Sequence, residues 1–418
     1  MAETGFEPPW PAREDVRITS VRAVVTAPEG IPLVVVRVGT STDGLHGLGC
    51  ATFTQRWPAV VAFVEQHLER LVLGRYPGDI EDLVRLARTA GYWRDGPVSG
   101  NAISGLDMAL WDIAGKRAGA PVHELLGGRS RAAADTYLHA GGASVGETLE
   151  QAEALVEQGL RHVRLQVGQR GTGTYGSPRS PGEHPDAPYP LGWSTTEHLQ
   201  VTTRLFDAAR ERLGDSLELL HDAHSRLTPA QAVALAGRLE PHRLFFLEDV
   251  LAPELWDRLP AVRSACRVPL AVGELATSAA EAARLVRGGG VDFLRCHLSA
   301  VGGLTPARKL AALCELEGVR TAWHGPGDTS PVGAAANVAL DVSSPAFGIQ
   351  EGHVYADAVH EVFPGTLVAQ RGWLAPNEAP GWGIELDERA ARRFPAELSG
   401  HDAWAARVRA PDGGLLAP

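Results

Sequence analysis

The chain has 418 residues, with 39 basic and 50 acidic side chains and a formal net charge of −11. This negative charge argues against nucleic-acid binding by bulk electrostatics, so we expect no nucleic-acid partner. No apolar run approaches the roughly 18 to 20 residues of a membrane span, so we expect no membrane association and a cytoplasmic location.

The apolar share of 44% is typical of a globular protein that buries a large core. At this length, one large barrel with a smaller domain fits better than a single small module. Only two lysines occur, Lys116 and Lys309, so a lysine base or Schiff base has just two possible sources. The four cysteines form no CxxC pair, which indicates buried free thiols.

The first part of the chain predicts a small α+β domain. Residues 17–55 contain β-branched apolar runs around a glycine-rich turn, which is typical of strands. Residues 57–126 then follow a helical pattern that ends before Gly127 and Gly128. We therefore expect an N-terminal α+β domain over residues 1–130.

After residue 131, short apolar runs alternate with amphipathic segments, and eight of these runs read as strands. They are residues 135–139, 162–167, 217–222, 244–249, 269–274, 292–296, 319–324 and 346–351. Most are followed by a helical pattern, which favours an α/β fold built on a (β/α)8 barrel over an open sheet. We expect the barrel over residues 131–354 and a C-terminal segment, 355–418, that folds back on the rest.

Two segments have a position that matters for the barrel. Thr228-Pro229 and Thr305-Pro306 each predict a helix start, with a capping hydroxyl before a proline at the first helical position. Residues 168–192, after the second strand, are rich in Gly, Pro and Ser. A loop of this length at the carboxyl end of a barrel strand predicts a lid or binding loop over the site.

Three acidic residues end three consecutive strands. Asp222, Glu248 and Glu274 are separated by 26 and again by 26 residues, the length of one strand–helix unit, so they should stand at the same height. Three convergent carboxylates need a cation among them, and oxygen-only ligands select a hard ion such as Mg²⁺. The spacing selects Glu248 over its neighbour Asp249.

Other polar residues lie at the same end of the barrel. His224 follows Asp222 by two residues, so in an extended chain it faces the same side. His324 closes the seventh strand, and Arg164 and Arg295 lie within apolar strand runs, where a buried guanidinium needs a partner.

Long motifs in this chain resemble the mannonate dehydratase subgroup of the enolase superfamily. They include HDAHSRLTP, FFLEDVLAPE, RCHLSAVGGLTPARKLAALCE, TAWHGPGDTSPVG and FGIQE in the barrel, and GYWRDGPV and LDMALWDIAGKRAGAPVHELLGG before it. The resemblance implies a modified (β/α)7β barrel, an α+β capping domain and a C-terminal segment that returns to the cap. It also implies Mg²⁺-dependent dehydration of D-mannonate or D-gluconate to 2-keto-3-deoxy-D-gluconate.

The resemblance also implies roles for individual residues. One Mg²⁺ per active site would be held by Asp222, Glu248 and Glu274. Tyr175 in the long loop would be the base, assisted by Arg164, and His224 would be the acid for the departing 3-hydroxyl. A guanidinium beside the phenol favours the phenolate and makes a tyrosine a usable base. The implied substrate contacts are Thr54, His139, Arg295, His324, Asp328, Glu351 and Trp404.

Two other chemistries of the superfamily do not fit the residues. One uses lysines at the ends of the second and sixth strands, where this chain has Gln166 and Arg295. The other pairs a seventh-strand histidine with an aspartate at the end of the sixth strand. His324 is present, but Asp292 begins its strand, so we expect it at the opposite end of the barrel.

Two departures from the subgroup leave the substrate open. Thr54 stands where the sugar-binding pattern usually has an asparagine, and the loop after Glu274 reads ATSAAEA in place of an asparagine-rich stretch. Losing an amide that bonds a substrate hydroxyl costs about 1–3 kcal/mol, enough to change the preferred epimer. The alternatives are a dehydratase for another acid sugar, or a slow or silent homologue with a regulatory role. The resemblance suggests a homo-oligomer assembled from dimers.

Overall fold

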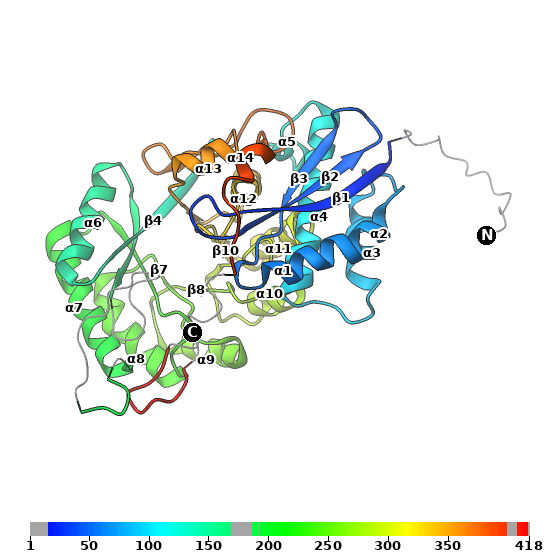
Figure 1. Ribbon diagram of the computed structural model, residues 1–418. Helices are drawn as coiled ribbons and strands as arrows, with labels where there is room; N and C mark the ends of the chain where they lie inside the picture. Colours follow the sequence, from blue (N-terminus) through cyan, green and yellow to red (C-terminus); the bar gives the residue numbers. More distant parts are fainter. Residues whose placement is uncertain (1–15, 169–185, 191, 399–407, 417–418) are drawn as a thin grey trace.

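The computed structural model describes residues 16–168, 186–190, 192–398 and 408–416. It consists of an antiparallel sheet with helices packed on it, which we call the cap, and a parallel barrel beside it (Figure 1). Tyr175 and Trp404 lie outside the described residues.

The cap has a three-stranded antiparallel sheet in the order β1-β2-β3. The strands are β1 (Ile18–Thr26), β2 (Leu33–Thr40) and β3 (His46–Cys50). Helices follow, as the sequence predicts: α1 (Trp57–Phe63), α2 (Glu69–Val72), α3 (Ile80–Thr89), α4 (Pro97–Ala118) and α5 (Val122–Leu125). A short 3-10 helix, η1 (Thr54–Arg56), and a π-helical segment, η2 (Val64–Leu68), flank α1.

Helix α4 lies against β3 at a distance that only glycine allows. A Cβ atom on Gly49 would lie 2.0 Å from the carbonyl oxygen of Gly105 in α4, far inside contact distance. This close approach buries most of α4 and forms a core of its own for the cap.

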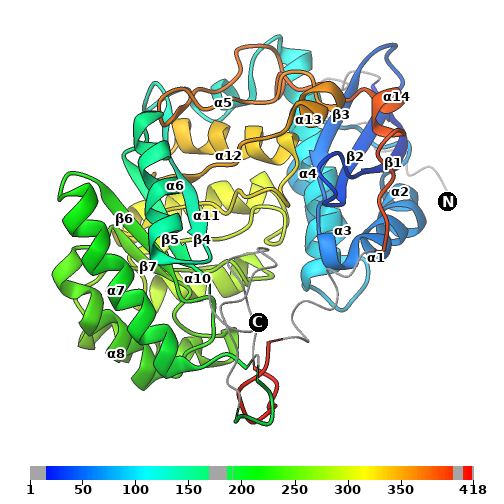
Figure 2. The same cartoon turned by 60° about the vertical axis from the view of Figure 1, so that its left-hand side comes forward.

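Within the part of the chain that the structure describes, the barrel has eight parallel strands, most of them followed by a helix (Figure 2). The strands are β4 (Ala134–Gly142), β5 (His162–Val167), β6 (Glu218–Asp222), β7 (Phe246–Glu248), β8 (Leu270–Val272), β9 (Phe293–Leu294), β10 (Arg320–Thr321) and β11 (Gln350–Glu351). Seven helices connect them: α6 (Val145–Glu157), α7 (Thr195–Leu213), α8 (Pro229–Leu239), α9 (Leu259–Ala265), α10 (Ala279–Arg287), α11 (Leu304–Glu317) and α12 (Pro331–Ser343).

The pairing closes the sheet into a barrel. β11 pairs with β4, and a bridge between Thr321 and Phe347 joins β10 to the segment before β11. β10 leads through α12 to β11, so the connectivity is (β/α)7β. All eight predicted strand positions are confirmed, and most strands are shorter than the apolar runs.

The C-terminal segment contacts both parts. β12 (Trp373–Leu374) pairs antiparallel with β4, and α14 (Glu388–Ala391) contacts β1 of the cap, close to α13 (Asp357–Val362). Trp382 donates its indole N–H to the carbonyls of Leu48 and Met108 in the cap.

One of the two predicted helix starts is correct. Thr228 caps α8 and forms a reciprocal capping box with Gln231. The prediction for Thr305 is wrong, because α11 begins one residue earlier, at Leu304, after Gly303 with φ 105°. A backbone N–H in its first turn, which has no partner within the helix, is satisfied by a residue distant in sequence: Asp107 of α4 accepts a hydrogen bond from the buried Thr305 N–H at 3.0 Å.

Asp107 therefore gives a test of pH-dependent stability. Burial raises the pKa of this carboxyl to about 7, even though hydrogen bonds from Thr305 and Leu304 oppose the shift. Between about pH 4 and 7 the folded state holds more protons than the unfolded state, so the free energy of unfolding falls as pH rises. We expect Asp107→Asn, which keeps the acceptor oxygen, to remove this loss, which is on the order of 4 kcal/mol at most.

Urea unfolding of Asp107→Asn and of the unchanged protein at pH 5, 6, 7 and 8 measures the effect. The stability difference in favour of the variant should grow up to about pH 7 and then stay constant. Asp82→Asn, at an exposed position of α3, is the control and should leave the pH profile as it is. A difference that does not depend on pH would contradict the assignment.

Candidate active site

Acidic side chains converge at the carboxyl ends of β6, β7 and β8. Asp222 and Glu248 face each other in register across the β6–β7 pair, and both are buried. Glu274 follows two residues after β8. The sequence predicts that the three residues stand at the same height in the barrel, and the strand register shows this directly for Asp222 and Glu248.

Asp249 belongs to this group as well. One carboxylate oxygen each from Glu248, Asp249 and Glu274 lies within 4.8 Å of the others. Burial, together with Asp222, raises the pKa of Glu248, and burial with Glu274 raises that of Asp249. Crowded, buried oxygen donors are the ligand set that fits a hard divalent cation. The sequence spacing selected Glu248 alone, and the adjacent acidic residue was the signal for Asp249.

Two arginines hold these carboxylates together. Arg295 contacts three of them: its Nε lies 2.8 Å from Glu248, its Nη1 2.9 Å from Glu274 and its Nη2 2.5 Å from Glu351. Arg164 on β5 places Nη1 3.3 Å from Glu248, 3.5 Å from Asp222 and 3.4 Å from Glu351. Both guanidinium groups are buried, so they neutralise charge that water cannot reach.

Glu351 on β11 connects this network to His139 on β4. Its Oε1 lies 2.7 Å from Nε2 of His139, whose Nδ1 lies 3.0 Å from Arg164 Nη2. Burial, with Arg164 beside it, lowers the pKa of His139 to about 4. Burial alone would raise the pKa of Glu351, but Arg295 and His139 hold it well below its ordinary range. The ring is therefore neutral beside a charged carboxylate.

His224 reaches the site by a different backbone path from the one predicted. The reasoning from an extended chain is wrong, because β6 ends at Asp222 and His224 has φ 53°, a left-handed conformation. Its N–H donates to Asp222 Oδ1 at 2.6 Å, and Arg226 Nη2 lies 2.9 Å from its Nδ1. Burial, with Arg226, lowers the pKa of His224 to about 4.

His324 and Asp328 lie beside Glu274. The Nε2 atom of His324 is 3.4 Å from Glu274 Oε1. Burial would lower the pKa of His324, but Glu274 and Asp328 raise it above its ordinary value. The structure therefore brings together Arg164, Asp222, His224, Glu248, Glu274, Arg295, His324, Asp328, Glu351 and His139.

Thr54 does not join these residues. Its buried hydroxyl donates to the carbonyl of Pro32 in the cap at 3.4 Å. Its predicted substrate contact therefore stays a prediction, as do those of Tyr175 and Trp404.

The two chemistries excluded by sequence stay excluded in the structure. Asp292 precedes β9 and pairs with Arg263 at 2.7 Å, at the opposite end of the strand from His324's partners. Lys116 pairs with Asp112 at 2.8 Å, and Lys309 pairs with Glu81 at 2.5 Å. Neither lysine reaches the carboxylates at the strand ends.

A separate cavity of about 800 Å³ lies between α3 and α4 of the cap and α10 and α11 of the barrel. None of the carboxylates at the carboxyl ends of the barrel strands lines it. The convergent buried charges at those strand ends are therefore the stronger indication of a functional site.

Two family models match the chain. The mandelate racemase / muconate lactonizing enzyme N-terminal domain matches residues 7–127, and the enolase C-terminal domain-like model matches residues 147–390. The chain belongs to the enolase superfamily. The superfamily and the fold predicted from the motifs are confirmed.

Relatives place the chain more closely within this superfamily. A D-galactonate dehydratase family member from Catenulispora acidiphila is 64% identical over 98% of this chain and 96% of its own length. Another member, from Pantoea ananatis, is 45% identical over 96% of this chain and 99% of its own length. The chain is thus a member of the D-galactonate dehydratase family, an enolase-superfamily group named for a lyase reaction.

A solved structure shares the whole architecture. An enolase from Pantoea ananatis, with D-gluconate and Mg bound, matches with a TM-score of 0.91 and 44% identity, over 96% of this chain and 100% of that chain. Among the described residues, no helix of this superfamily member is long and apolar enough to cross a membrane.

Proposed function

We propose that this protein dehydrates an acid sugar, D-mannonate or D-gluconate, to 2-keto-3-deoxy-D-gluconate with one Mg²⁺ per active site. The buried carboxylates at the ends of β6, β7 and β8, together with Arg164 and Arg295, carry the proposal. The relatives' dehydratase family and the neighbour's bound D-gluconate and Mg support it. The protein would act in the cytoplasm as a homo-oligomer assembled from dimers.

In this proposal, Asp222, Glu248 and Glu274 hold the cation, with Asp249 close enough to contribute. Bound Mg²⁺ supplies the positive charge that stabilises the substrate carboxylate and the enediolate that forms from it. Arg295 and Arg164 add fixed positive charge at the same place, so an anionic substrate is attracted despite the chain's net charge of −11.

The proton transfers fall to this chain's own side chains. Tyr175, as phenolate favoured by Arg164, takes the proton from C2, and the C3–O bond breaks as His224, in its charged imidazolium form, donates a proton to the departing hydroxyl, which leaves as water and leaves the ring neutral. Burial and Arg226, 2.9 Å from Nδ1, lower the pKa of His224 and so make its charged form a stronger acid. The enol then tautomerises to the 2-keto-3-deoxy acid.

A panel of acid sugars tests the proposal. With Mg²⁺ present, we expect D-gluconate or D-mannonate to yield a 2-keto-3-deoxy product and chelation of the metal to stop it. D-galactonate, the sugar in the family name, is the necessary comparison. The second candidate, a slow or silent homologue that binds acid sugars in a regulatory role, is favoured by Thr54 and the altered loop after Glu274. It predicts calorimetric binding of an acid sugar without product.

A further inference from the structure

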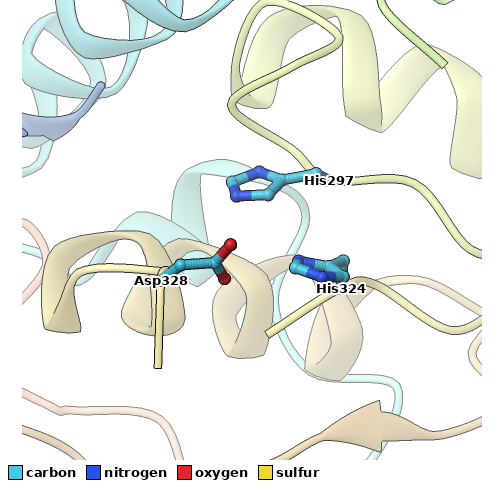
Figure 3. Close-up of side chains that lie close together, drawn as sticks. All are labelled: His297, His324 and Asp328. Carbon is cyan, nitrogen blue, oxygen red and sulfur yellow. The ribbon is translucent and has the colours of Figure 1, made fainter. Parts of the chain in front are cut away.

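His297 is a half-buried histidine to which the proposed reaction gives no role. It lies two residues after Arg295, and its ring faces His324 and Asp328 (Figure 3). One nitrogen or oxygen atom from each of the three lies within 4.8 Å of the others. The rings of His297 and His324 stack, with centroids 5.0 Å apart and planes inclined by 26°.

The hydrogen bonding of His297 determines what its free nitrogen can do. The backbone N–H of Ser299 donates to Nδ1 of His297 at 3.1 Å. Burial, with His324 nearby, lowers the pKa of His297 to about 3, so its ring is neutral at neutral pH. A neutral imidazole that accepts at Nδ1 carries its proton on Nε2.

This tautomer distinguishes between two interpretations of the His297, His324 and Asp328 cluster: a metal site and a hydrogen-bonding site. Two histidines and an aspartate resemble a transition-metal site. A metal on Nε2 would require the proton to move to Nδ1, where it would meet the Ser299 N–H. The arrangement instead presents Nε2–H of His297 as a hydrogen-bond donor.

The neighbouring groups show what such a donor would meet. Nδ1 of His324 and Oδ1 of Asp328 are both buried without a hydrogen-bond partner among the described residues. Buried polar atoms of this kind need a partner. A sugar hydroxyl both accepts and donates hydrogen bonds, so a single hydroxyl can satisfy a donor nitrogen and a carboxylate oxygen together.

We propose that His297 is a substrate-positioning residue whose Nε2–H donates to one hydroxyl of the acid sugar, beside His324 and Asp328. The inference rests on the proposed function and adds to it a residue that selects among acid sugars. His324 and Asp328 already belong to the expected substrate contacts; His297 does not.

Two substitutions distinguish the effect of the Nε2–H donor from the effect of the aromatic ring. His297→Phe keeps a flat ring to stack on His324 but removes the donor, and His297→Gln places an amide N–H near the position of Nε2. With Mg²⁺ and the best acid sugar of the panel, we expect His297→Phe to raise KM about 10- to 100-fold and to change kcat less than about threefold. His297→Gln should recover a large part of this loss.

Deoxy acid sugars give a readout that a structural role would not move. For the one analogue that lacks the bonded hydroxyl, the unchanged protein and His297→Phe should have the same KM; for the other analogues the difference should persist. His242→Phe is the matched control, a buried histidine that pairs with Asp207 at 3.3 Å just before β7, and should leave KM unchanged.

Three results would overturn the assignment. They are an unchanged KM in His297→Phe, an equal rise of KM for every deoxy analogue, and loss of calorimetric Zn²⁺ binding, measured with Mg²⁺ in excess, in His297→Phe but not in His242→Phe. The last result would make His297 a metal ligand. An unchanged protein that neither binds nor converts any acid sugar would contradict the proposed function itself, and this inference with it. If the unchanged protein is active and His297→Phe has the same KM, only this inference is contradicted.

Discussion

Replacing Glu274 with glutamine is expected to lower kcat/KM for the best acid sugar by at least about 100-fold and to weaken Mg²⁺ binding in parallel. Even groups that only orient a metal's ligands cost about 10- to 100-fold when removed, so a direct ligand should cost no less. Burial would raise the pKa of Glu274, but His324 and then Arg295 lower it below its ordinary value, so the unchanged side chain is a charged donor. Glutamine keeps its shape and removes that charge.

Calorimetry with Mg²⁺ and steady-state kinetics on the same preparation measure both effects. Glu218→Gln is the matched control, since Glu218 is exposed at the opposite end of β6 and should change neither value. If Glu274→Gln binds Mg²⁺ as the unchanged protein does and still converts the substrate, the ligand assignment is wrong.

The sequence predicted the barrel and the acidic strand ends for a physical reason. A strand buried on both faces is a continuous apolar run, so a charged residue that closes it, such as Asp222 or Glu248, stands out. The interval of 26 residues then follows from the length of one strand–helix unit. The register of Asp222 against Glu248 confirms that reasoning.

Features that depend on contacts between distant residues were not predictable in the same way. The cap on α11 comes from Asp107, 198 residues earlier, so the local Thr305-Pro306 pattern pointed to the wrong start. The left-handed backbone at His224 and Ser225 has no signal in these residue types. The sequence could predict that the buried Arg164 and Arg295 need acidic partners. It could not predict that Glu351, from the last strand, is one of them. For His297 a signal was present in the sequence, because it follows Arg295 by two residues at the end of an apolar strand run.

The charge arrangement indicates why the two arginines matter beyond substrate binding. Without a cation, Arg295 is the group that touches Glu248, Glu274 and Glu351 together. Without Arg295, among the described residues, Glu248 and Glu351 keep only Arg164 as a cationic arginine partner and Glu274 keeps only His324, so the negative charge at the site is incompletely compensated, which is costly for buried carboxylates. Arg295 and a bound cation should therefore partly substitute for one another in stabilising the site.

If Arg295 and the cation can replace one another in this way, Arg295→Met should show it, because methionine keeps an unbranched side chain but removes the charge. In metal-free buffer we expect the free energy of unfolding to fall by about 3–5 kcal/mol, since the buried Glu248 and Glu351 and the partly exposed Glu274 lose a shared partner. Adding Mg²⁺ should raise the Tm of the variant by more than that of the unchanged protein, because the folded variant gains more from the cation. Thermal unfolding with and without Mg²⁺ measures the difference.

Arg308→Met is the control for Arg295→Met, because Arg308 also pairs with a glutamate, Glu81, but both side chains are substantially exposed. Exposed pairs contribute little, so its stability should stay within about 0.5 kcal/mol and its response to Mg²⁺ should not change. An equal fall in the free energy of unfolding in the two variants would show that burial does not determine how much an ion pair contributes to stability here. A variant at position 295 with an ordinary response to Mg²⁺ would show that the cation does not share the carboxylates with Arg295, and the cation site would then have to lie apart from Glu248 and Glu274.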